Sequence, residues 1–141
     1  HATSGSPWDG RFRTAPLQAA TWLLPLMYHL DDLPVRVGLV DRPEHYTWSS
    51  AAHYCGLGTL PGLTPPEPVW AMGNTPFERE ASYRRGLQGG LPADAAEGLE
   101  RGLARGWPLG DARWLERIAR GAGRPVSPRR AGRPRSVRAP D

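Results

Sequence analysis

The clearest pattern of apolar positions along the chain lies at residues 17–32 and predicts a helix. Apolar side chains recur there at spacings of three and four residues, which places them on one face of an α-helix. Pro25 predicts a kink or a restart within this stretch. Pro34 predicts that the helix ends at Leu33, because proline disfavours helical angles in the residue before it. The apolar face consists of Leu23, Leu26, Met27 and Leu30.

The rest of the chain predicts short helices bounded by capping residues and glycines. Thr75 followed by Glu78 is a capping box, and it predicts a helix that runs to about Leu87. Asp111 is a second N-cap, for a helix that the glycines at 121 and 123 end. Further helical stretches are predicted at 49–55, 69–72 and 93–104, and residues 8–15 are predicted to form a short strand or extended segment.

Composition and charge add a small core and a basic tail to this pattern. Seventeen glycines and sixteen prolines in 141 residues predict many loops in at most one domain. The chain has no lysine, and nine of its eighteen arginines lie from Arg113 onward, against Glu116 and Asp141. A mildly acidic body therefore precedes a strongly basic tail, which is typical of nucleic-acid binding or of a solvated, disordered terminus.

Several classes of site find no support in the residue pattern. Cys55 is single, which excludes a disulfide framework and fits a reducing cytoplasm. No apolar run reaches the ~20 residues that span a membrane. The histidines show no zinc-ligand spacing. The paired carboxylates Asp31–Asp32 and Glu78/Glu80 indicate a solvated helix face rather than an acid/base pair.

One block of the chain resembles the signature of a known family. Residues 33–50, which begin Leu-Pro-Val-Arg-Val-Gly-Leu-Val and end Trp-Ser-Ser, are similar to the "NPVRAGLV…PEDYxWSS" string of the REP-associated tyrosine transposases. Leu33 stands where that family usually has Asn, and Val37 where it has Ala. Further similar segments follow the family's order at 5–13, 21–32, 64–73, 79–84, 107–114 and 123–134.

The resemblance implies a fold and a domain organisation. The family's catalytic domain is a ferredoxin-like α+β unit, so we expect a mostly α chain that keeps one strand plus a helix of that unit. Short helices and a disordered basic tail follow. The chain starts at His1 rather than Met, and we expect a partial reading frame or a decayed copy. The expected parts are 1–55 for the C-terminal part of the catalytic domain, 56–121 for a helical region and 122–141 for a disordered Arg/Pro-rich tail.

The resemblance also implies an activity, and a loss of it in this chain. The family cleaves and rejoins single-stranded DNA at palindromic repeats, with a tyrosine nucleophile and a divalent metal, Mg or Mn, at a His-x-His motif. Both motifs lie upstream of the part that this chain resembles, so we expect no catalytic residue and no metal site here. The alternatives are a small non-catalytic regulatory protein that binds DNA through its arginine tail, and a decayed remnant without function. His29 is predicted to be partly buried and hydrogen-bonded, and Tyr28, Tyr46, Tyr54 and Tyr83 to pack as structural residues.

The expected partner is hairpin or single-stranded DNA, or duplex DNA through the tail. In the body, arginines either contact DNA or form local ion pairs with Asp9 and Asp41. Trp48 either stacks on a base or packs in the core, and the serine after it can bind phosphate. The tail carries two degenerate Gly-Arg-Pro units similar to AT-hook cores. The candidate DNA-binding residues are Arg11, Arg13, Arg36, Arg42, Trp48, Ser49, Arg124, Arg129, Arg130, Arg133 and Arg135.

Overall fold

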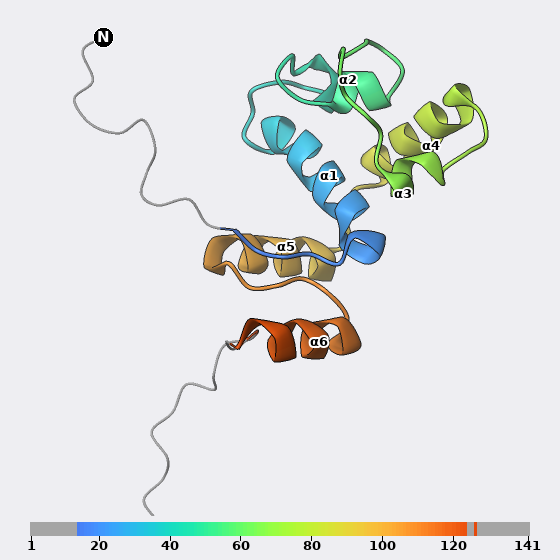
Figure 1. Cartoon of the computed structure of the whole chain (residues 1–141). Helices are drawn as coiled ribbons and strands as arrows, with labels where there is room; N and C mark the ends of the chain where they lie inside the picture. Colours follow the sequence, from blue (N-terminus) through green and yellow to red (C-terminus); the bar gives the residue numbers. More distant parts are fainter. Residues whose placement is uncertain (1–13, 124–125, 127–141) are drawn as a thin grey trace, which may run out of the picture.

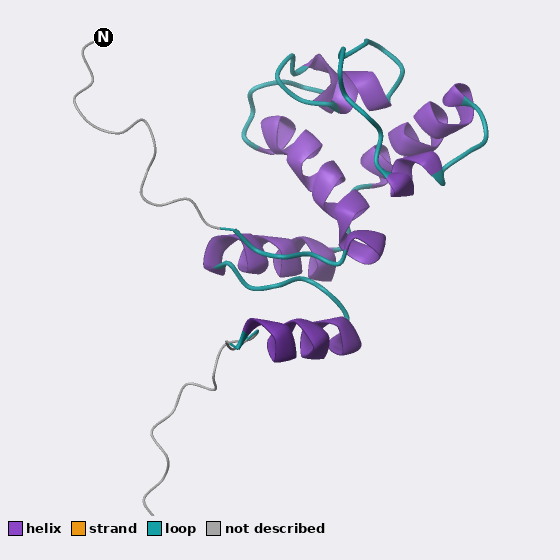
Figure 2. Cartoon of the chain, viewed as in Figure 1, coloured by secondary structure: helices purple, strands orange, loops and turns teal. Residues whose placement is uncertain are grey.

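Helices form nearly all the regular secondary structure that the chain shows (Figures 1 and 2). The computed structural model describes residues 14–123 and Val126, and the prediction of a mostly α chain is confirmed for them. The predicted strand at 8–15 falls largely outside these residues, and Thr14 and Ala15 belong to no strand. The elements are α1 (Ala19–Arg36), the 3-10 turn η1 (Pro43–His45), α2 (Ala51–Tyr54), α3 (Glu67–Trp70), α4 (Pro76–Gly89), α5 (Ala93–Arg105) and α6 (Ala112–Ala122).

The end of α1 corrects the prediction made from Pro34. The helix continues through this proline to Arg36, and Pro34 lies on its buried face, where packing offsets the one backbone hydrogen bond that proline cannot make. A glycine ends the helix instead. Gly38 has a φ of 72°, its amide donates to the Val35 carbonyl at 2.9 Å, and the Leu39 amide donates to the Pro34 carbonyl at 2.8 Å. This pair of bonds is a Schellman motif.

The predicted caps of the later helices are confirmed. The Thr75 hydroxyl accepts from the Glu78 amide at 3.2 Å, and the Glu78 carboxylate accepts from the Thr75 amide at 3.1 Å. At the start of α6, the Asp111 carboxylate accepts from the Trp114 amide at 2.8 Å. Of the two glycines predicted to end this helix, Gly121 lies within α6, and Gly123, with a φ of 59°, is the C-cap after its last residue, Ala122.

The first four α-helices enclose one apolar cluster, which we call the α1–α4 core. Its buried members come from α2, α3 and α4 and from the residue after α2, and Leu24, Met27 and Tyr28 of α1 pack against it. Residues on both sides of the expected boundary at 55/56 share this core. The buried members are Ala51, Tyr54, Cys55, Val69, Tyr83 and Leu87.

The last two helices, which we call the α5–α6 region, lie beyond the end of this core. Figure 1 shows α5 beneath α1, and α6 beneath α5. Leu99 of α5 is fully buried, and Leu109 in the connection to α6 is 9% exposed. A Cβ at Gly102 would come within 2.8 Å of the Leu109 side chain, so α5 needs a glycine for this close approach.

The segment before α1 and the segment before α6 are hydrogen-bonded to each other, and we call these bonds the Gln18–Asp111 clasp. The Gln18 amide donates to the Leu109 carbonyl at 2.8 Å, and the Leu109 amide donates to the Pro16 carbonyl at 3.0 Å. The Gln18 side chain donates to the Asp111 carboxylate at 2.8 Å and accepts from the Asp111 amide at 2.8 Å. The clasp therefore sets where α6 begins.

Candidate nucleic-acid interface

Asp31 belongs to a buried hydrogen-bond network, and the prediction that it lies on a solvated helix face is wrong. It is 3% exposed. Its carboxylate accepts from the Tyr83 hydroxyl at 2.8 Å and from the Ser50 hydroxyl at 3.1 Å. Burial raises the pKa of Asp31 above its usual value, and the two hydrogen bonds oppose that rise. The network joins α1, the start of α2 and α4, so its role is structural.

The core tyrosines pack around the same carboxylate. The Tyr83 ring lies 4.9 Å from the Tyr28 ring and 5.0 Å from the Tyr54 ring, measured between centroids. Burial raises the pKa of all three phenols, and the Asp31 charge contributes to the rise for Tyr83. A phenol held in its neutral form packs well and is a poor nucleophile, in keeping with the expected structural role.

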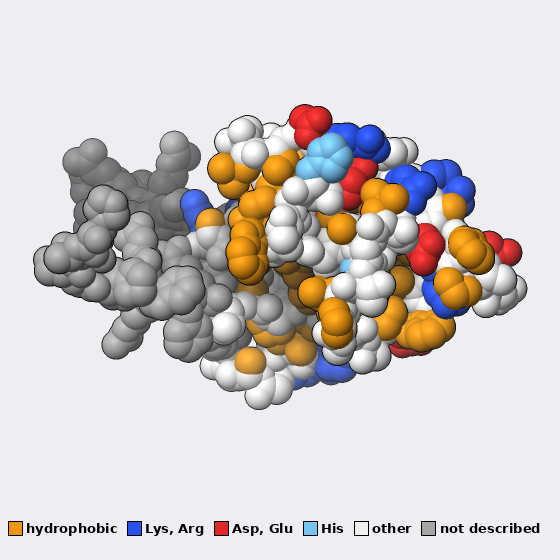
Figure 3. Space-filling view, turned by 90° about the horizontal axis from the view of Figure 1, so that it is seen from above, with side chains coloured by type: hydrophobic (Ala, Val, Ile, Leu, Met, Phe, Trp, Pro, Cys, Tyr) orange, Lys and Arg blue, Asp and Glu red, His pale blue; other side chains and the backbone are white. Residues whose placement is uncertain are grey.

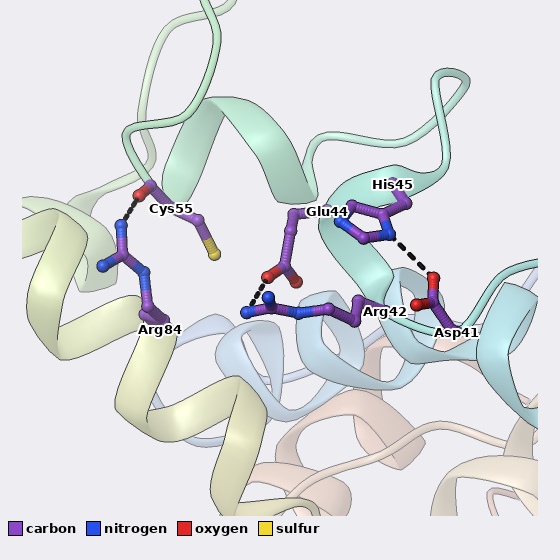
Figure 4. Close-up of polar contacts among 6 residues, drawn as sticks. All are labelled: Asp41, Arg42, Glu44, His45, Cys55 and Arg84. Carbon is purple, nitrogen blue, oxygen red and sulfur yellow. Dashed lines mark hydrogen bonds and ion pairs between the residues drawn. The ribbon is translucent and has the colours of Figure 1, made fainter.

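Arg36 and Arg42, the two arginines among the predicted DNA contacts that the structure describes, both have acidic partners. Arg36 bonds to Glu100 of α5 at 2.6 Å, and Arg42 bonds to Glu44 at 2.6 Å (Figure 4). These local ion pairs do not involve Asp41, which instead bonds to His45 at 2.7 Å (Figure 4). The hydrogen bond from His45 lowers the pKa of Asp41.

His29 is buried and hydrogen-bonded, as predicted. It is 5% exposed, and its Nδ1 lies 3.2 Å from the Arg36 guanidinium. A guanidinium only donates, so Nδ1 is the acceptor in this bond. His29 thereby helps to hold the direction of the Arg36 side chain.

Trp48 lies on the surface, and the interpretation of this residue as a core side chain is wrong. It is 86% exposed, which leaves its ring accessible for stacking. The hydroxyl of Ser49, by contrast, is used locally: it donates to the Tyr46 carbonyl at 3.3 Å and accepts from the Ala51 amide at 3.2 Å. Ser49 therefore supports the start of α2.

Arg84 and Cys55 hold α4 against the end of α2. The Arg84 guanidinium donates to the Cys55 carbonyl, and Cys55 itself is a buried free thiol (Figure 4). Burial raises the pKa of this thiol, so it stays protonated and packs as a small apolar side chain.

Sequence reasoning missed a row of three arginines on α6, which we call the arginine stripe. Arg113, Arg117 and Arg120 are all exposed. Their spacing of four and three residues puts them on one side of the helix, while Trp114 and Ile118 of the other side are partly buried. That spacing is the signal in the sequence that identifies the stripe.

The stripe differs from the body in its lack of partners. Within the described residues, no stripe side chain forms a hydrogen bond or an ion pair, whereas Arg36 and Arg42 have carboxylate partners. On the face seen from above in Figure 3, basic and acidic side chains lie next to one another. Of the three, Arg117 lies close enough to Asp111 for its charge to lower the pKa of that carboxyl. The stripe is thus a described surface on which three arginines without a bonded carboxylate can meet phosphates.

The other predicted DNA contacts lie outside the described residues. They are Arg11, Arg13, Arg124, Arg129, Arg130, Arg133 and Arg135.

The described residues do not fit the divalent metal that the resemblance implies for the whole family. Among them, no three side chains of His, Cys, Asp or Glu stand where they could hold one ion. We therefore assign no metal-dependent step to this part of the chain. None of the described helices has the length and the apolar character that crossing a membrane requires.

Comparison with known proteins gives no information on the function of this chain. No protein family, no curated protein and no solved structure matches this chain. The described residues form a helical fold with an exposed row of arginines that have no bonded carboxylate partner.

Proposed function

We propose that this chain is a DNA-binding protein and that the arginine stripe of α6 is its principal folded contact surface. The observation that carries the proposal is the stripe itself, three exposed arginines on one face of a positioned helix that form no hydrogen bond or ion pair with a carboxylate of the described residues, although the charge of Arg117 lowers the pKa of Asp111. The guanidinium group suits phosphate because its fork of N–H donors matches two phosphate oxygens.

The dimensions of the stripe suit a DNA backbone. From Arg113 to Arg120 the helix rises ~10 Å at about 1.5 Å per residue. One strand of duplex DNA advances ~3.4 Å along its axis per phosphate and also winds around that axis, so the stripe is long enough to meet more than one phosphate. Arg124 follows Arg120 by four residues, and the basic sequence continues from there. The folded stripe and the arginine-rich tail are therefore neighbours in sequence.

The sequence resemblance extends this proposal to a particular class of DNA-binding protein. We propose that the chain corresponds to the C-terminal part of a cytoplasmic REP-associated tyrosine transposase, with α1 as the last helix of its ferredoxin-like domain. The nucleophile and the Mg or Mn ion would belong to the preceding part of such a protein. The expected ligand is then a DNA hairpin or a single strand, for which the exposed Trp48 ring offers a stacking surface.

The test is DNA binding by the full chain and by two triple variants with equal charge changes. The first variant replaces the stripe: Arg113→Gln, Arg117→Gln and Arg120→Gln. The control replaces exposed arginines elsewhere: Arg85→Gln, Arg101→Gln and Arg105→Gln. Fluorescence anisotropy would measure the binding of a labelled imperfect hairpin, an unstructured strand and a duplex across a salt series.

We expect the stripe variant to lose roughly tenfold or more in affinity near 0.1 M salt. On duplex, its slope of log K against log salt should become shallower by about 2 to 3, at ~0.9 per lost phosphate contact. An equal loss in the control variant would overturn the assignment to α6. A preference for the hairpin would support the transposase interpretation, and equal binding of all three DNAs would contradict it in favour of a non-specific regulatory protein.

A further inference from the structure

A cavity of about 320 Å³ opens between α1 and the connection from α4 to α5. Its polar wall comes from α1, where His29, Asp32 and Arg36 follow one another at spacings of three and four residues and so share a face. Its apolar wall includes Leu87 and Leu91. A slot with one polar and one apolar wall suits a flat heterocycle, and its volume lies at the lower end of ligand pockets.

The polar wall offers an acceptor, Asp32, and a donor, Arg36, which already has partners. Within the described residues, the Asp32 side chain forms no hydrogen bond. Arg36 is held in place by His29 and by Glu100. The side chains of the Arg36–Glu100 pair are 43% and 51% exposed, and ion pairs so open to solvent contribute little to stability. A ligand can therefore take over part of the Arg36 fork at small cost.

We propose that this cavity binds a guanine base that DNA presents unpaired, an inference that rests on the proposed function. Guanine has two adjacent acceptors, O6 and N7, which match the fork of an arginine, and donors at N1 and N2, which match a carboxylate. Asp32 and Arg36 lie one helical turn apart, with Cβ atoms separated by ~5–6 Å, so that both can reach one base. Adenine, cytosine and thymine each lack part of this set.

The test measures the preference for guanine separately from DNA binding as such. The full chain would be titrated with a labelled oligo-dT strand, with the same strand carrying one central dG, and with free dGMP and dAMP. We expect the dG strand to bind about tenfold more tightly than oligo-dT. The dG strand should also bind more tightly than dGMP, because the phosphates of the strand add contacts that a mononucleotide lacks.

Two variants of the polar wall and one matched control test whether the preference for the dG strand depends on the cavity. Asp32→Asn replaces one carboxylate oxygen with an amide, and Arg36→Lys keeps the charge but loses the fork. Both should reduce the preference for dG over oligo-dT from about tenfold to less than about threefold. Asp94→Asn, an exposed position outside the cavity, should keep the full preference. Near-ultraviolet circular dichroism would verify that each variant retains the fold.

The outcomes separate this inference from the proposed function. Equal binding of both strands by the wild-type chain would overturn the guanine site, even with salt-dependent DNA binding intact. Tighter binding of dGMP than of the dG strand would overturn DNA as the source of the base. Failure of the arginine-stripe test would overturn only the contact surface on α6, because the comparison of the two strands does not depend on it.

Discussion

The α1–α4 core and the α5–α6 region are held together in different ways. The core buries the Asp31 carboxylate, which two hydroxyl groups hydrogen-bond, and packs the Tyr28 and Tyr54 rings against the Tyr83 ring. The α5–α6 region depends on Leu99, the close approach at Gly102 and the Gln18–Asp111 clasp, and α6 has no buried residue. The core is thus the more extensively bonded part of the described chain, and the α5–α6 region attached to it carries the exposed arginine stripe.

The two regions differ in packing because the core buries a carboxylate, whereas α6 buries no residue completely. A buried carboxylate is tolerated only when its hydrogen bonds are complete, which demands a fixed arrangement of α1, α2 and α4. A helix with a half-buried apolar side and an arginine side makes no such demand. We therefore expect the α5–α6 region to open at lower free energy than the core.

Truncation of the Leu99 side chain should reduce the free energy of unfolding more than any other change proposed here, and it should act on the α5–α6 region. Leu99→Ala leaves a cavity under α5 and should reduce the free energy of unfolding by about 2–5 kcal/mol. Urea denaturation would measure the loss, and hydrogen exchange should show faster exchange in α5 and α6 than in α4. Equal acceleration in α4 would show that the two regions unfold as one unit. Leu103→Ala, at a 40% exposed position of the same helix, is the control and should cost much less.

Removal of the Tyr83 hydroxyl should weaken the core by a smaller amount. Tyr83→Phe leaves the Asp31 carboxylate short of one donor, so the free energy of unfolding should fall by about 1–3 kcal/mol at neutral pH. Tyr46→Phe is the control, because the Tyr46 hydroxyl forms no hydrogen bond within the described residues. A loss as large in the control would contradict the role of the network.

The same variant should respond to pH in a defined direction. Because burial raises the pKa of Asp31, the folded state holds its proton more tightly than the unfolded state does. The stability from this group is full below its unfolded pKa of ~3.9 and is lost as pH rises through the higher folded pKa. Loss of the Tyr83 bond raises that pKa further, so Tyr83→Phe should cost less near pH 4 than at pH 7. Urea denaturation at both pH values would measure the difference, and an equal cost would contradict it.

Loss of the side-chain bonds of the clasp should have the smallest effect on stability. This effect should be confined to the start of α6. Gln18→Ala removes two exposed hydrogen bonds to Asp111 and should cost about 1 kcal/mol. Hydrogen exchange should accelerate at the start of α6 and remain unchanged in α4. Gln88→Ala, at an exposed position of α4, provides the matched control. Faster exchange throughout the core would show that the clasp supports the whole chain.

The helices that sequence predicted best are those with local signals at their ends. The capping box at Thr75 and the cap at Asp111 depend on residues three positions apart, so the pattern of neighbours is sufficient. The predicted helix end at Leu33 was wrong because the effect of Pro34 depends on whether the helix face around it is buried. The arginine stripe could also have been predicted from the sequence, because its spacing of four and three residues follows the periodicity of a helix.

The sequence by itself determined the helical class, the caps of α4 and α6 and the concentration of arginine towards the C-terminus, because these depend on residue type and short-range spacing. Only the tertiary structure decided the burial of Asp31, the exposure of Trp48 and the pairing of Arg36 with Glu100. Each of these depends on contacts between residues that are distant in sequence. Packing sets which polar groups lose water and must find partners, and the order of residues along one segment does not specify that.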